Sequence, residues 1–156
     1  LAGSPLVGWF SDRLGSKKLP IVGGGVAISG FWLYVVVIAG AKPPVAIMGP
    51  LYFIVGMLGI VFMLCFANTK DVNHPNLSGT ATGFVNISGF LATALVNVLI
   101  GWRLDSLWDG TLRDGVPMYT QANFQSAFIV YLFIALMALV ASLFMYETRR
   151  ENADEH

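Results

Sequence analysis

The stretch Phe124–Tyr146 reads Phe-Gln-Ser-Ala-Phe-Ile-Val-Tyr-Leu-Phe-Ile-Ala-Leu-Met-Ala-Leu-Val-Ala-Ser-Leu-Phe-Met-Tyr and contains no charged residue. At a rise of about 1.5 Å per residue, roughly 20 apolar residues cross a hydrocarbon core of about 30 Å. Apolar and polar residues do not alternate here, which excludes a strand of a membrane barrel. The stretch therefore predicts a transmembrane helix, whose backbone groups are hydrogen-bonded within the segment.

Three further stretches lack charged residues: Leu19–Ala41, Val45–Ala67 and Thr80–Trp102. The whole chain of 156 residues is 56% hydrophobic and 12% charged, against about 25% charged in a soluble domain. We therefore expect an all-α, polytopic membrane protein with four complete transmembrane helices. Residues Leu1–Phe10 are apolar but too short to span, so we interpret them as the end of an earlier helix of a longer protein.

Charge and cysteine content exclude several functions. Nine Lys and Arg balance nine Asp and Glu, so there is no basic excess for binding nucleic acid. The single cysteine, Cys65, excludes an intrachain disulfide framework and a metal site built from several cysteines. We find no nucleophile–base pair, and we expect no catalytic residues, no metal and no cofactor.

The basic residues predict the orientation of the chain. Loops Ser11–Lys18 and Asn68–Gly79 and the tail Glu147–His156 fall on one side of the four helices. Six Lys and Arg lie on that side and three on the other, where Arg103–Asn123 is the longest loop. Because cytoplasmic loops are enriched in Lys and Arg, we expect the first side to be cytoplasmic.

The first loop carries a motif with a readable physical role. Its sequence is Gly8-Trp-Phe-Ser-Asp12-Arg13-Leu-Gly15-Ser-Lys17-Lys18. The first glycine allows close approach of a neighbouring helix, and the second allows a tight turn. The carboxylate is suited to a helix N-terminus, whose free N–H groups favour an anion. The basic residues hold the loop at the cytoplasmic surface or simply fix topology.

This G-x-x-x-D-R-x-G-x-K-K motif resembles the cytoplasmic loop signature of the major facilitator superfamily. The stretch Gly79–Asp105 is also similar to the eleventh helix of bacterial members, especially sugar-phosphate-permease-like and organic-anion transporters. The resemblance implies the end of helix eight to helix twelve of a twelve-helix transporter in a bacterial cytoplasmic membrane. It implies as partners a small solute, an organic anion being one class, together with membrane lipid and the remaining helices of the same transporter.

The third stretch carries a polar stripe. Thr82, Asn86, Thr93 and Asn97 are spaced by four, seven and four residues, which places them on one helical face. Such a face avoids lipid, because an unpaired amide in hydrocarbon is costly. The residues either contact a solute or form hydrogen bonds between helices, and we favour the solute for Asn86 more than for Asn97.

The other stretches suggest packing more than binding. Gly23–Gly25 in the first predict close helix contact, and Trp32 is expected to face lipid. In the second, Pro50 predicts a kink, and Gly56 and Gly59 permit close packing or bending. Tyr52 is a candidate for solute binding, although we favour a place in the interfacial aromatic belt. Ser78 is expected to cap the N-terminus of the third helix.

Secondary active transport of a small solute by alternating access is the function that this combination favours. The signature residues, above all Asp12, are then expected to control the change between conformations. A receptor or adaptor without transport activity on the same fold remains an alternative. A membrane-embedded enzyme is a weaker one, since the sequence shows no cluster of His, Asp or Glu near the interface.

Overall fold

The computed structural model describes residue 13 and residues 15–146, and it is mainly helical. Four of its helices are long and apolar enough to cross a membrane, which confirms the predicted all-α polytopic fold. The elements in chain order are α2 (Lys18–Leu33) with a π-helical continuation η1 (Tyr34–Ile38), α3 (Val45–Gly59), α4 (Phe62–Val72), the 3-10 turn η2 (Pro75–Leu77), α5 (Ser78–Ser106), the two-residue strands β1 (Leu112–Arg113) and β2 (Val116–Pro117), and α6 (Gln121–Leu143).

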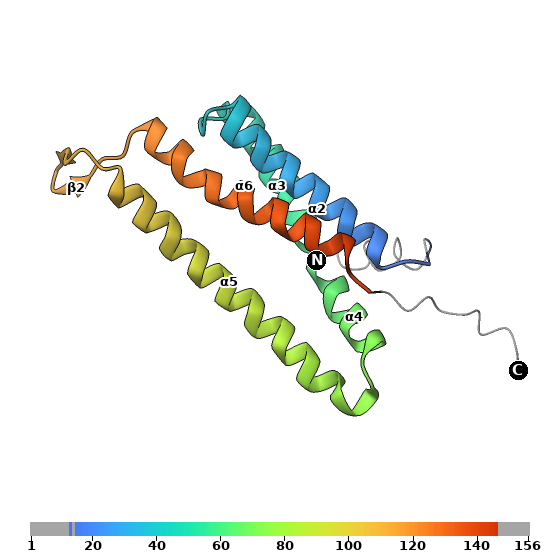
Figure 1. Cartoon of the computed structure of the whole chain (residues 1–156). Helices are drawn as coiled ribbons and strands as arrows, with labels where there is room; N and C mark the ends of the chain where they lie inside the picture. The colour runs from blue at the N-terminus through green and yellow to red at the C-terminus, as the bar shows by residue number, and fades with distance from the viewer. Residues whose placement is uncertain (1–12, 14, 147–156) are drawn as a thin grey trace, which may run out of the picture.

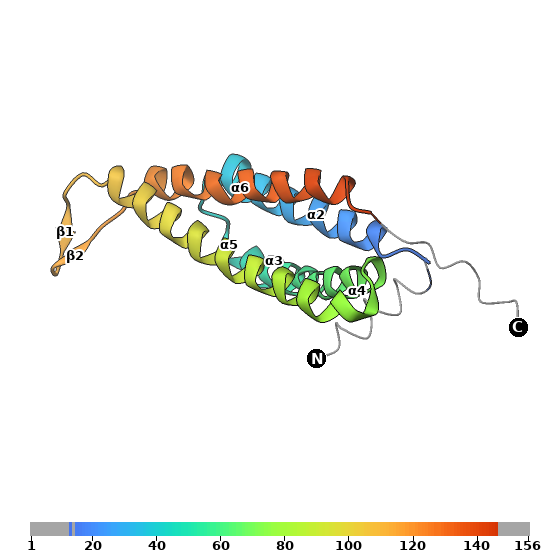
Figure 2. The same cartoon turned by 60° about the horizontal axis from the view of Figure 1, so that its bottom comes forward.

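The helices form two layers, which Figure 2 shows from the side. Helices α2 and α6 lie together in one layer and have the most extensive contact in the chain. Helices α3, α4 and α5 make up the other layer. In Figure 1, α5 and α6 meet near the β hairpin and diverge toward the opposite end, where α4 approaches α5.

Glycines allow the α2 backbone to approach its neighbours. A Cβ atom added at Gly25 would lie 3.2 Å from Leu139 Cδ1 of α6, and one added at Gly24 would lie 3.2 Å from Val61 Cγ1. The predicted small-residue face therefore does pack. Trp32 was expected to face lipid. Its ring also contacts the protein, because it stacks on Tyr131 of α6 with centroids 4.3 Å apart. The two flat rings extend the α2–α6 contact.

The second membrane helix is broken between α3 and α4. The amide nitrogens of Ile60 and Val61 donate to carbonyls three residues earlier, at 3.2 and 3.0 Å, so the helix tightens there. The break follows Gly59, as the expectation of local bending at the glycines allows. It is not at Pro50, which lies inside α3. Nothing in the described part of the chain lies within 4 Å of a Cβ atom added at Gly56.

The π-helical turn gives α6 a second, polar attachment to α2. The carbonyl of Val36 in η1 accepts a hydrogen bond of 2.8 Å from Gln125 Nε2 of α6. Gln121 Nε2 donates to the carbonyl of Gly40 at 2.7 Å. These bonds satisfy carbonyls at the end of the first membrane helix, where the regular pattern of bonds stops.

At the opposite end, the described parts of the two loops predicted to share one side of the membrane lie together. Lys17 forms an ion pair with Asp71 near the end of α4. Asn68 Nδ2 donates to the carbonyl of Tyr146, 3.1 Å away, beyond α6. Helix α4 extends to Val72, further than its charge-free stretch. Ser78 is not the predicted N-cap, because it is already the first residue of α5, and its hydroxyl donates to Pro75 O at 2.9 Å.

Candidate functional site

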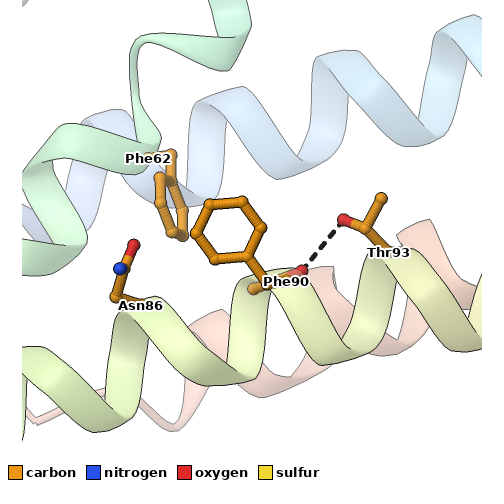
Figure 3. Close-up of a pocket in the computed structure, with 5 residues that line it drawn as sticks. Phe62, Asn86, Phe90 and Thr93 are labelled. Carbon is orange, nitrogen blue, oxygen red and sulfur yellow. Dashed lines mark hydrogen bonds between the residues drawn. The ribbon is translucent and has the colours of Figure 1, made fainter.

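A groove lies between the start of α4 and the middle of α5. Its volume is about 320 Å³, and its lining consists of Phe62 from α4 and Asn86, Gly89, Phe90 and Thr93 from α5. Figure 3 shows the two aromatic rings between the Asn86 amide and the Thr93 hydroxyl. The groove thus brings together two of the four residues of the predicted polar stripe.

The polar groups of the stripe differ in how they are satisfied. Thr93 Oγ1 donates to the Gly89 carbonyl at 2.9 Å, and Thr82 Oγ1 donates to carbonyls of Ser78 and Gly79. These hydroxyls are therefore satisfied as donors within their own helix and keep the capacity to accept. No hydrogen bond to the Asn86 amide occurs within the described part of the chain. Asn86 therefore has both donors and its acceptor available to a bound molecule.

Three candidates, Thr82, Asn97 and Tyr52, are not part of this groove. Asn97 is exposed on α5 and does not line it. Tyr52 lies elsewhere, beside a separate cavity of about 210 Å³ whose lining includes Phe31 and Trp32 of α2. Its ring meets Phe31 edge to face with centroids 6.1 Å apart, and the residue is 59% exposed. The structure thus separates Tyr52 from Asn86 and Thr93.

Phe62 and Phe90 line the groove but were not predicted as site residues from the sequence. Phe62 opens α4 directly after the break, and its ring faces Gly89 of α5. Phe90 follows Asn86 by four residues and therefore shares its helical face. That spacing was a usable signal for Phe90. No local pattern places Phe62, because the stretch from α3 into the first turns of α4, Val45–Ala67, is apolar on all sides.

The signature loop is only partly visible. Gly8 and Asp12 lie outside the described residues. Gly15 has a φ of +59°, so the loop turns at the predicted glycine through a conformation that favours this residue. The remaining members of the motif are Arg13, Lys17 and Lys18.

The ion pair of Lys17 has a partner that sequence reasoning did not anticipate. Asp71 lies 54 residues further along the chain, so only the fold brings the two side chains together. Their side chains are 26% and 42% exposed, respectively. A partly exposed pair of this kind contributes about 0–1 kcal/mol. Its main effect is to join the signature loop to the end of α4.

The loop at the other end of the helices contains polar contacts. Tyr119 donates its hydroxyl proton to Asp105 Oδ1 at 2.6 Å, and this bond raises the pKa of the Tyr119 hydroxyl. The backbone N–H of Thr111 donates to Asp109 Oδ1 at 2.9 Å, which lowers the pKa of that carboxyl. Asp109 is exposed and Tyr119 is half-buried, so these bonds order the loop and do not form a buried site.

Among the described residues, no group of three or more His, Cys, Asp or Glu side chains is placed to hold a metal ion. Chain composition, four apolar helices and a large exposed apolar surface all indicate an integral membrane protein.

Comparison with known proteins gives one match. The family model of the Major Facilitator Superfamily matches residues 1–156. No curated protein and no solved structure matches the chain significantly. The match covers the signature loop, the four membrane helices and the groove on α5. The chain therefore belongs to the Major Facilitator Superfamily, a family of membrane transporters.

Proposed function

We propose that the chain forms part of a secondary active transporter that moves a small solute by alternating access. The observation that carries this proposal is the groove on α5, where Asn86 is unsatisfied and Thr93 offers an acceptor. A membrane helix exposes such groups where a solute or water meets them, because lipid cannot satisfy them. The membership of a transporter family supports the same function.

We further propose that the chain corresponds to the end of helix eight through helix twelve of the family fold. The resemblance of Gly79–Asp105 to the eleventh helix supports this position. In this position, the end of the chain that carries Lys17 and Asp71 is cytoplasmic, and the membrane is a bacterial cytoplasmic membrane. An organic anion is the solute class that the resemblance suggests. A non-transporting receptor on this fold would use the same groove for binding alone.

Transport by the full-length protein tests the proposal. The protein is reconstituted in vesicles and screened for uptake of labelled small solutes, and the uptake found is then compared between Asn86→Ala and Asn97→Ala. We expect Asn86→Ala to lower uptake about tenfold, the effect of losing roughly 1.4 kcal/mol of interaction. Asn97→Ala is the matched control and should retain wild-type uptake.

Expression and thermal stability of both variants should match those of the wild type, because neither residue is buried. Wild-type uptake by both variants would contradict a solute-contacting role for Asn86. Absence of uptake for every solute tested, with a tight-binding solute found instead, would favour the receptor.

The signature loop supplies a second part of the proposal, in which Asp12 stabilises the conformation closed to the cytoplasm. A carboxylate at a helix N-terminus is worth about 0.3–2 kcal/mol, and about 1.4 kcal/mol changes a two-state population tenfold. Asp12→Asn should therefore increase cysteine accessibility on the cytoplasmic side of the cavity and slow turnover. Unchanged accessibility and turnover would reduce Asp12 to a loop charge.

A further inference from the structure

The break in the second membrane helix directs two consecutive side chains to two different neighbours. Val61, inside the break, packs against Gly24 of α2, whose added Cβ would lie 3.2 Å from Val61 Cγ1. Phe62, the first residue of α4, lies against Gly89 of α5, whose added Cβ would lie 3.3 Å from Phe62 Cζ. Both glycines leave the space that their partner fills. The break therefore fixes the position of the Phe62 ring beside α5.

In this position Phe62 forms one wall of the α5 groove. Phe90 supplies a second aromatic ring, and Figure 3 shows both rings on the side of α5 that carries Asn86 and Thr93. Phe62 also meets Phe66 edge to face with centroids 5.0 Å apart, which supports its ring from behind. The lining thus combines two aromatic rings, one amide and one hydroxyl.

The groove lining contains no charged residue. The Thr93 hydroxyl donates its proton to Gly89 O, so it is left as an acceptor. The Asn86 amide is the main donor available. Aromatic rings attract flat apolar groups through their faces and edges, whereas a carboxylate or phosphate in this groove would gain no counter-charge for the water it loses.

We propose that Phe62 determines the specificity of this groove. The groove binds an uncharged part of the solute, whose flat, apolar portion lies against the aromatic rings. Asn86 forms a hydrogen bond with one neutral polar substituent of that part. This assignment rests on the proposed transport function and deepens it. An anionic group on the same solute would have to bind outside this groove.

The test uses two photoreactive probes with the same ring system. 4-Benzoylbenzamide is neutral and carries a carboxamide, and 4-benzoylbenzoate is its carboxylate counterpart. Each is irradiated with the full-length protein in nanodiscs, with and without an excess of benzamide. The labelled sites are mapped by mass spectrometry. Labelling that benzamide suppresses reports the groove, and labelling that benzamide leaves unchanged reports lipid-facing side chains.

We expect the amide probe to give suppressible labelling between Asn86 and Thr93, and the carboxylate to give at least about fivefold less. Loss of an aromatic contact weakens binding about fivefold, so Phe62→Ala should lower suppressible labelling by that factor. Phe62→Leu keeps an apolar side chain but removes the ring, and it should also lower suppressible labelling. Phe53→Ala is the control, since Phe53 is 70% exposed on α3 and outside the groove.

Equal suppressible labelling by the carboxylate would overturn the substrate class. Unchanged labelling in both Phe62→Ala and Phe62→Leu would overturn the role of Phe62. Failure of the transport proposal can be distinguished from failure of this one. In that case labelling follows the expected pattern, but vesicles show binding and no uptake.

Discussion

Helices α2 and α5 differ sharply in how their sides are used. Helix α2 has buried residues, glycine-mediated contacts and a stacked Trp32–Tyr131 pair toward α6. Helix α5 is longer, yet none of its residues is buried. Asn86 and Thr93 of α5 line a groove, whereas the small-residue face of α2 packs against its neighbours. In the proposed transporter, α2 and α6 form a support and α5 presents the surface that contacts the solute.

The largest loss of thermal stability is expected when a larger side chain is placed between α2 and α6, which form the support. Gly25→Val would put a branched side chain against Leu139, 3.2 Å from the position of the new Cβ. Overpacking of this kind costs about 1–3 kcal/mol. We expect Gly25→Val to lower the thermal unfolding temperature of the full-length protein in detergent, measured by the loss of the monodisperse peak after heating.

Gly23→Val is the matched control, because nothing lies within 4 Å of a Cβ added at Gly23. Both variants place the same residue in the same helix, so the intrinsic helix propensity cancels. Equal unfolding temperatures for the two variants would show that α2 and α6 do not pack as described.

A smaller loss of thermal stability is expected when the hydrogen bond between α6 and η1 is removed. Gln125→Leu removes the hydrogen bond to the Val36 carbonyl and leaves that half-buried carbonyl without its partner. Hydrogen bonds between membrane helices average about 0.6 kcal/mol. Gln125→Leu should therefore lower the unfolding temperature less than Gly25→Val does.

Gln121→Leu provides the comparison for this variant. Gln121 is exposed, so water can replace its bond to Gly40, and the expected change is smaller still. An effect of Gln121→Leu that equals or exceeds that of Gln125→Leu would show that the π-helical carbonyl does not depend on Gln125.

The sequence predicts the four helices and the polar stripe because both depend on local composition. Absence of charge over a membrane thickness is a strong signal, and the four-residue spacing of Thr82 and Asn86 identifies one face. The dipeptide Asp114-Gly115 is also typical of a β-hairpin turn, and both residues have a positive φ. That hairpin between β1 and β2 was not predicted, although the motif was present.

The remaining features depend on contacts between distant segments. The sequence allows a kink at Pro50 or bending at Gly56 and Gly59, and contacts in the fold place the break directly after Gly59, at Ile60–Val61, where Val61 contacts Gly24. An apolar helix gives no periodic signal for which side meets a neighbour. The position of Phe62 in the groove and the pairing of Lys17 with Asp71 follow from this tertiary arrangement.

The central claim is that the polar side of α5 faces an aqueous solute pathway and that its opposite side faces lipid. Single cysteines at Asn86 and Thr93 are compared with single cysteines at Phe84 and Leu91, on the opposite side of the helix. The full-length protein, made cysteine-free, is treated in native membranes with a charged, impermeant methanethiosulfonate reagent. The account predicts reaction at 86 and 93 and none at 84 and 91. Equal reaction on both sides, or reaction only at 84 and 91, would contradict it.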